Sequence, residues 1–121
     1  MGSPERPVVA VVGDGSSLYA IQALWSAVEY QVGAVFVVLA NGGYAVMDRL
    51  AEKHGGGRSP WPAVSHTDVA GLAESFGCAA RRIGSHASLL ETFDEVLPVL
   101  GERRTPLLIE VAIEADPEFS P

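Results

Sequence analysis

Apolar residues follow two alternating patterns along the chain. Apolar runs rich in valine cover residues 7–12 and 34–39, a run interrupted only by Glu110 covers 107–113, and a weaker run covers 78–83. Such runs are typical of strands buried on both faces, as in parallel sheets. Between them, apolar residues recur every three or four positions, which predicts amphipathic helices at 17–31, 44–54, 67–76 and 86–100. The alternation of strands and helices predicts a three-layer α/β sandwich with a mostly parallel sheet.

Local signals refine these boundaries. Ser16 or Ser17 is placed to cap the first helix, and Thr67 or Asp68 the third. We expect Trp25 and Phe36 in the core, Cys78 as a small buried apolar residue, and the three histidines in solvent. The length of 121 residues fits one domain. Residues 114–121 are acidic and contain two prolines, which predicts a frayed tail.

Charge and cysteine content narrow the possible partners. The chain carries 15 acidic and 8 basic residues, and its net charge of −7 argues against nucleic-acid binding. Its apolar runs fall well short of the roughly 18 residues that a membrane span needs. The single cysteine excludes an internal disulfide and fits a reducing compartment, so we expect a cytoplasmic protein.

Two polar turns follow the first two predicted strands. Gly13-Asp14-Gly15-Ser16 comes after the first, and Ala40-Asn41-Gly42-Gly43 after the second. A right-handed crossover between parallel strands brings their carboxyl ends to the same edge of the sheet. If the two strands are neighbours, Asp14 and Asn41 face one crevice, which is where open α/β sheets bind ligands.

The residue types in this crevice predict a metal–diphosphate site. Asp14 offers a carboxylate, Asn41 an amide oxygen, and Gly42 and Gly43 accessible carbonyls. These hard oxygen ligands suit Mg²⁺ or Ca²⁺. Gly15 permits close approach of the backbone, and the amides of residues 15–17 open a helix, an arrangement that attracts phosphate. A divalent ion between carboxylate and diphosphate removes their mutual repulsion.

Plainer interpretations exist for several of these residues. The Gly-Asp-Gly-Ser sequence alone is a common turn, and it gains meaning from the preceding strand and from the spacing to Asn41. Tyr44 fits a surface aromatic at a helix start nearly as well as a diphosphate contact. Met47 and Leu50, at helical spacing, are more typical of a core than of a pocket. A doubly wound nucleotide binder is a further alternative, but the chain lacks GxGxxG.

At this point the motifs resemble a known family. Gly13-Asp14-Gly15, followed after 25 residues by Asn41, resembles the thiamine-diphosphate fingerprint. Matches over residues 4–44 and 105–111 extend the resemblance to thiamine-diphosphate enzymes of the benzoylformate decarboxylase group. The resemblance implies that Asp14, Asn41 and the Gly43 carbonyl ligate Mg²⁺. It also implies a cofactor site that includes Gly13, Gly15, Ser16 and Tyr44, and a substrate pocket lined by Val46, Met47 and Leu50.

The sequence also departs from this family. Ala40 replaces the first asparagine of the family's pair, and Leu50 stands where the resembled group has an aromatic residue. The segment that precedes this region in the family has no counterpart in the chain, so the domain is expected to be incomplete. The family's activating glutamate lies on a separate pyrimidine-binding domain.

Two functional hypotheses follow from the resemblance. In the first, the chain is the Mg²⁺-dependent diphosphate-binding module of a 2-oxo-acid decarboxylase. It carries no catalytic residue of its own and is inactive without a pyrimidine-binding domain or subunit. In the alternative, it is a non-catalytic remnant that acts as an interaction or oligomerisation module. An apolar sheet face left without cover would in either case favour self-association.

Overall fold

The computed structural model describes residues 6–55, 61–114, 116 and 118. In this part of the chain, four strands form one sheet in the order β1-β2-β4-β3. They are β1 (Val9–Gly13), β2 (Val35–Ala40), β3 (Ala79–Ile83) and β4 (Leu107–Ala112). All three pairings between them are parallel, so the predicted parallel α/β sheet is confirmed.

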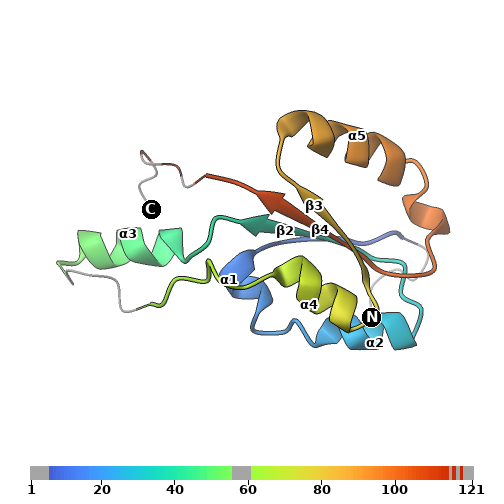
Figure 1. Ribbon diagram of the computed structural model, residues 1–121, viewed down its shortest axis with the longest axis horizontal. Coiled ribbons are helices and arrows are strands. Elements are labelled where there is room, and N and C mark those ends of the chain that lie inside the picture. The colour runs from blue at the N-terminus through green and yellow to red at the C-terminus, as the bar shows by residue number, and fades with distance from the viewer. Residues whose placement is uncertain (1–5, 56–60, 115, 117, 119–121) are drawn as a thin grey trace.

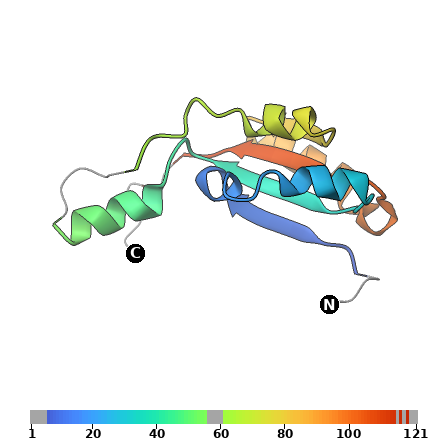
Figure 2. The ribbon, with the colours of Figure 1, turned by 90° about the horizontal axis from the view of Figure 1, so that it is seen from below.

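Helices cover the two faces of this sheet (Figures 1 and 2). The helices α2 (Ala23–Glu29) and α4 (Val69–Ser75) lie on one face, and α5 (His86–Val96) lies on the other. The short α1 (Asp14–Ser17) follows β1 directly, and the 3₁₀ helix η1 (Leu100–Glu102) precedes β4. The helix α3 (Ala45–Lys53) projects beyond the carboxyl ends of the strands (Figure 2). The three-layer arrangement is therefore as the sequence predicts.

The core is split by the sheet into two clusters, because successive strand residues point to opposite faces. On one side, Val38 and Leu108 pack with Leu24 of α2 and with the small residues of α4. On the other, Val37 and Ile109 pack with Val96 of α5 and its neighbours. Cys78 belongs to the first cluster at 2% exposure, so its predicted role as a small buried residue is confirmed.

The predicted helix at 17–31 is wrong in its first half. The chain forms α1 at residues 14–17, then turns at 18–22, in which the amides of Tyr19 and Ala20 bond three residues back, and only then α2. Ser17 does not cap α1, since its hydroxyl donates to the Asp14 carbonyl (2.6 Å) and Gly13 occupies the N-cap position. Such side-chain bonds compete with helix propagation. Trp25, expected in the core, is 53% exposed.

The last helix also ends earlier than predicted. Its apolar spacing continues to residue 100, but α5 stops at Val96. Leu97 keeps helical dihedral angles and its amide still bonds to the Phe93 carbonyl (2.9 Å), but Pro98 lacks an amide hydrogen and cannot continue this bonding, which explains the early end.

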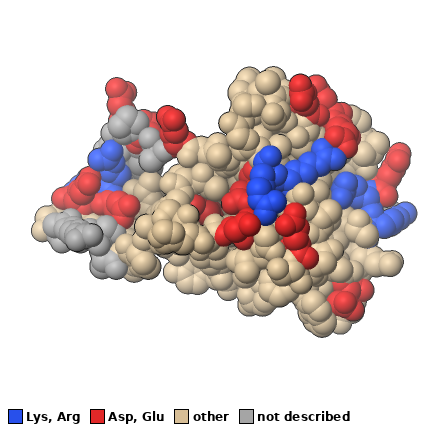
Figure 3. All heavy atoms as spheres, in the orientation of Figure 1, with Lys and Arg blue, Asp and Glu red and all other residues tan. Residues whose placement is uncertain are grey.

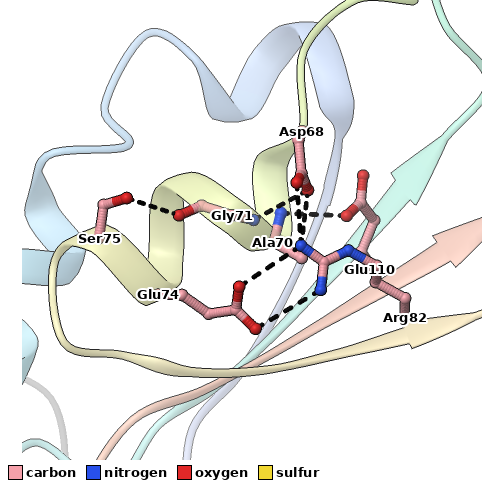
Figure 4. A network of polar contacts seen from close by, with 7 residues as sticks. All are labelled: Asp68, Ala70, Gly71, Glu74, Ser75, Arg82 and Glu110. Carbon is pink, nitrogen blue, oxygen red and sulfur yellow. Dashed lines mark hydrogen bonds and ion pairs between the residues drawn. The ribbon is translucent and has the colours of Figure 1, made fainter.

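A polar network anchors α4 to the strands (Figure 4). Asp68 is the N-cap of α4, as predicted, and accepts a bond from the Gly71 amide (2.9 Å). Arg82 of β3 forms ion pairs with Asp68 (2.9 Å) and Glu74 (3.5 Å). Glu110 of β4 accepts a bond from the Ala70 amide (3.0 Å). Two strands thus supply charges that fix the position of the helix.

Some expectations fall outside the described residues. These include residues 1–5, which carry part of the family resemblance, most of the glycine-rich loop at 55–57, and most of the tail beyond residue 114. The histidines at 54, 66 and 86 are exposed, as predicted. In the described ranges, every helix is too short or too polar to cross a lipid bilayer.

Candidate functional site

The two polar turns lie side by side at the carboxyl edge of the sheet. In the register of β1 with β2, Gly13 pairs with Leu39. Asp14 and the stretch from Ala40 to Gly43 therefore leave the sheet next to each other. The strand adjacency assumed from the sequence is confirmed by this pairing.

A direct bond joins the two turns through the Asp14 carboxylate. This side chain is buried, with 5% exposure. Its Oδ1 accepts from the amide of Gly15 (2.8 Å), and its Oδ2 accepts from the amide of Gly42 (2.7 Å), 28 positions away. Bonds to a charged acceptor are the strong kind. A carboxylate has about four lone-pair positions, so two bonds leave acceptor capacity for a further ligand.

The second turn arranges further oxygen atoms near this carboxylate. Oδ1 of Asn41 accepts from the amide of Gly43 (3.1 Å), which holds the side chain over its own turn. Gly42 has φ of +77°, a conformation that favours glycine because other residues are strained there. The donor set consists of one carboxylate, one amide oxygen and main-chain carbonyls. This composition suits a hard cation such as Mg²⁺. Among the described residues, no group of three or more His, Cys, Asp or Glu is placed to hold a metal, so an ion in this crevice would depend on one carboxylate and on neutral oxygens.

Tyr44 closes one side of the crevice. Its hydroxyl donates to the Gly15 carbonyl (3.2 Å), and its ring lies 6.5 Å from that of Trp61. A Cβ at position 15 would lie 2.5 Å from Cε1 of Tyr44, so only glycine fits beneath the ring. Burial raises the pKa of the Tyr44 phenol above 10.0, with further contributions from Tyr19 and the charge of Asp14. The phenol therefore remains a hydrogen-bond donor at neutral pH.

These residues line one pocket of about 380 Å³. Its walls include every predicted metal and cofactor residue, namely Gly13, Asp14, Gly15, Ser16, Asn41, Gly43 and Tyr44. Of the predicted substrate residues, Val46 and Met47 line it, whereas Leu50 does not. Val46 is 50% exposed and Met47 39%, so both are open to solvent rather than packed in a core.

Sequence reasoning missed four contributors to this site, one of which is Ala45 at the start of α3. The Gly42 amide binds Asp14, and the positive φ that presents it could have been suspected from the Asn-Gly pair. Leu39 and Ile113 add an apolar wall at the ends of β2 and β4. Their pocket role has no local signal, because it depends on which strands are neighbours.

Comparison with known proteins assigns the family. Residues 1–111 match the family described as "Thiamine pyrophosphate enzyme, C-terminal TPP binding domain". Benzoylformate decarboxylase from Pseudomonas aeruginosa is 35% identical over 92% of this chain and 20% of its own length. A 3D-(3,5/4)-trihydroxycyclohexane-1,2-dione hydrolase from Shouchella clausii is 29% identical over 93% of this chain and 18% of its own.

Solved structures agree with this assignment. A thiamine diphosphate-dependent 4-hydroxybenzoylformate decarboxylase from Rhodococcus jostii superposes with a TM-score of 0.84 at 32% identity, over 94% of this chain and 21% of that one. Benzoylformate decarboxylase from Polynucleobacter necessarius shares the fold, with a TM-score of 0.80 at 23% identity over 91% of this chain and 20% of that one. The chain spans about a fifth of the length of such relatives. The chain therefore belongs to the thiamine pyrophosphate enzymes, as a C-terminal TPP-binding domain.

Proposed function

We propose that this domain anchors the diphosphate of thiamine diphosphate through Mg²⁺, as one module of a 2-oxo-acid decarboxylase-like enzyme. The observation that carries the proposal is the bond between Asp14 Oδ2 and the Gly42 amide (2.7 Å). It ties the acidic turn to the turn that holds Asn41. A carboxylate, an amide oxygen and a carbonyl therefore converge at one pocket.

The chemistry of the donor set fits the ion. Asp14 supplies the negative charge, while Asn41 and the Gly43 carbonyl are the neutral oxygen ligands. Two backbone amides hold the carboxylate in place before any ion binds, so little side-chain freedom is lost on binding. The amide of Ser16, at the start of α1, is the donor proposed for a diphosphate oxygen, because the amide of Gly15 is already bonded to the Asp14 carboxylate.

The cofactor, once bound, supplies the electron sink that lets a 2-oxo acid lose CO₂. The chain's own contribution is to bind and orient. Tyr44 shields the Gly15 side of the site from water, and its hydroxyl bond to the Gly15 carbonyl fixes that turn. Val46 and Met47 are proposed to form part of the substrate wall. Leu50 lies apart from this pocket, so any substrate contact it makes would require a shape other than the one described.

Activity is proposed to require a separate pyrimidine-binding domain or subunit, since the relatives are about five times longer than this chain. Self-association is proposed to use the face of the sheet beside α5. There, an apolar pocket of about 420 Å³ includes Val9 and Val11 of β1, and Val11 is 62% exposed. If the chain is instead a non-catalytic interaction module, this same face is the surface that it would use. The protein is further proposed to act in the cytoplasm.

Calorimetric titration of thiamine diphosphate tests the anchoring role. Binding is expected with Mg²⁺ and lost with a chelator. Asp14→Ala is expected to abolish it, and Asn41→Ala to weaken it by at least about tenfold. Because Asp14→Ala also removes two backbone bonds, Asp14→Asn is the milder companion variant. Asp48→Asn is the matched control, since it makes the same charge change on α3 at a residue that does not line the pocket.

Two results would contradict the anchoring role. One is binding that ignores Mg²⁺. The other is an equal loss of affinity in the Asp14→Asn and Asp48→Asn variants, which would indicate general electrostatics instead of ligation. Circular dichroism of each variant establishes that it is folded before its binding is interpreted.

A further inference from the structure

A second pocket lies at the opposite edge of the sheet from the cofactor site. It has a volume of about 320 Å³ and is formed by the segments that lead into β1, β2 and β4. We call it the Arg103 pocket, and the lining residues used below are Arg6, Gln31, Gly33, Arg103 and Arg104. The candidate cofactor pocket that contains Asp14, called the Asp14 pocket below, lies where the strands end. Because parallel strands start at one edge of the sheet and end at the other, the two pockets are separate sites.

Positive charge concentrates at the Arg103 pocket in an otherwise acidic chain. Three of the chain's 8 basic residues, Arg6, Arg103 and Arg104, line it, whereas its lining includes neither Asp nor Glu. Within the described ranges these three arginines form no ion pair, although Arg81 and Arg82 both do. Figure 3 shows basic atoms at the right-hand end of the molecule, with acidic atoms beside them, apart from the central basic patch.

One of these arginines has an unmet hydrogen-bonding requirement. Nε of Arg103 is buried and, among the described residues, lacks a hydrogen-bond partner. A buried donor without a partner is unfavourable, and native proteins usually satisfy such a group with water or a bound ion. The planar guanidinium suits an oxyanion in particular, because its N–H groups match pairs of oxygen atoms.

The backbone around the Arg103 pocket is closely fitted. A Cβ on Gly33 would lie 2.0 Å from the Arg103 carbonyl oxygen, so only glycine allows this segment to lie against the start of β2. Gln31 has φ of +53°, a left-handed conformation that glycine usually takes after a helix. Gln31 also lines the pocket, and its residue type carries an amide group that can donate hydrogen bonds.

We propose that the Arg103 pocket binds a small phosphate-bearing anion. Three guanidinium groups favour a multiply charged phosphate over a single carboxylate, since each added negative charge gains from every nearby cation. The volume lies at the lower end of the range for small-molecule sites. The bound oxyanion interacts with the guanidinium charges of Arg6, Arg103 and Arg104, and the unpartnered Nε–H of Arg103, which is buried, serves as the reporter of its binding. This site is separate from the pocket at the other edge of the sheet that is proposed to hold thiamine diphosphate.

The test is an NMR titration of the full chain with inorganic phosphate, followed through the arginine Nε–H resonances at constant ionic strength. We expect a saturable shift of the Arg103 resonance at about 1 mM phosphate or below. Arg104→Gln and Arg103→Gln are each expected to weaken binding by about tenfold or more. Arg81→Gln, the matched control with the same charge change outside the pocket, is expected to change affinity less than about twofold.

Three outcomes would overturn the proposal. They are a shift that never saturates, an acetate titration that matches the phosphate titration, and an equal loss of affinity in Arg81→Gln and Arg104→Gln. Arg104 is exposed, so its variant is expected to fold even if the Arg103 variant does not. Calorimetry with thiamine diphosphate in the presence of saturating phosphate separates the two sites. Unchanged cofactor affinity is expected, and competition would place the phosphate in the Asp14 pocket.

Discussion

The contact between Gly15 and Tyr44 yields a prediction that can be worked through in numbers. A methyl group at position 15 would lie 2.5 Å from Cε1 and 2.7 Å from Cζ of the Tyr44 ring, well inside van der Waals contact. Moving the ring breaks its hydroxyl bond to the Gly15 carbonyl. Overpacking of this kind costs about 1–3 kcal/mol. Against it, replacement of glycine by alanine restricts the unfolded chain and contributes about 0.4–1 kcal/mol of stability.

The two effects have opposite signs, so a double-mutant cycle separates them. Gly15→Ala is expected to destabilise the wild type by about 1 kcal/mol. In a Tyr44→Ala background the clash is gone, and the same substitution is expected to stabilise the domain by up to about 1 kcal/mol. Urea unfolding monitored by circular dichroism measures all four proteins. Gly13→Ala is the control, because its Cβ meets no atom within 4 Å in the described structure.

The sign of the stability change caused by Gly15→Ala in the two backgrounds shows whether the Tyr44 ring lies over this glycine. If Gly15→Ala changes stability by the same amount with and without Tyr44, the ring does not lie over this glycine. The tyrosine would then have no place at the diphosphate turn. An equal destabilisation by Gly13→Ala would point to a general intolerance of the turn to side chains.

Three further expectations concern other parts of the molecule. The hydrogen bond from the Gly71 amide, and after it the Arg82 guanidinium, lowers the pKa of Asp68 below 3.8. The ionised Asp68 carboxylate therefore stabilises the folded domain above about pH 4, and this stabilisation is lost as the pH falls through the lowered pKa. Asp68→Asn keeps a side chain that can cap the helix. The difference in free energy of unfolding between wild type and this variant, measured by urea unfolding at a series of pH values, should disappear in acid, and a difference that stays constant with pH would contradict this. In urea unfolding, Gly33→Ala should lower the free energy of unfolding of the domain by about 3 kcal/mol, because its Cβ would clash with the Arg103 backbone. Gly101→Ala, whose Cβ meets no described atom within 4 Å, should not. Sedimentation should detect self-association that Val11→Lys weakens, whereas a wild-type monomer at all micromolar concentrations would refute it.

The layers, the parallel strands and the Asp14 turn could be predicted because each leaves a local pattern. Valine runs mark buried strands, and the spacing between Asp14 and Asn41 places two turns at one edge. The break between α1 and α2 was not predictable from apolar spacing. At the break, the Ser17 hydroxyl bonds to the Asp14 carbonyl, and such a side-chain bond does not appear in a hydrophobic pattern.

Features that join distant segments escaped prediction for a different reason. The strand order that seats β4 between β2 and β3 brings Glu110 to the start of α4 and Ile113 to the cofactor pocket. Likewise, the Arg103 pocket combines segments near residues 6, 31 and 103. No single window of sequence contains these neighbours, so only the assembled sheet reveals them.

A crystal structure of the domain with Mg²⁺ and thiamine diphosphate tests the central claim most directly. The account predicts one ion about 2.1 Å from side-chain oxygens of both Asp14 and Asn41, with the diphosphate against the Gly15 turn. An ion that contacts only one of these two side chains, or a diphosphate bound elsewhere on the domain, would contradict it.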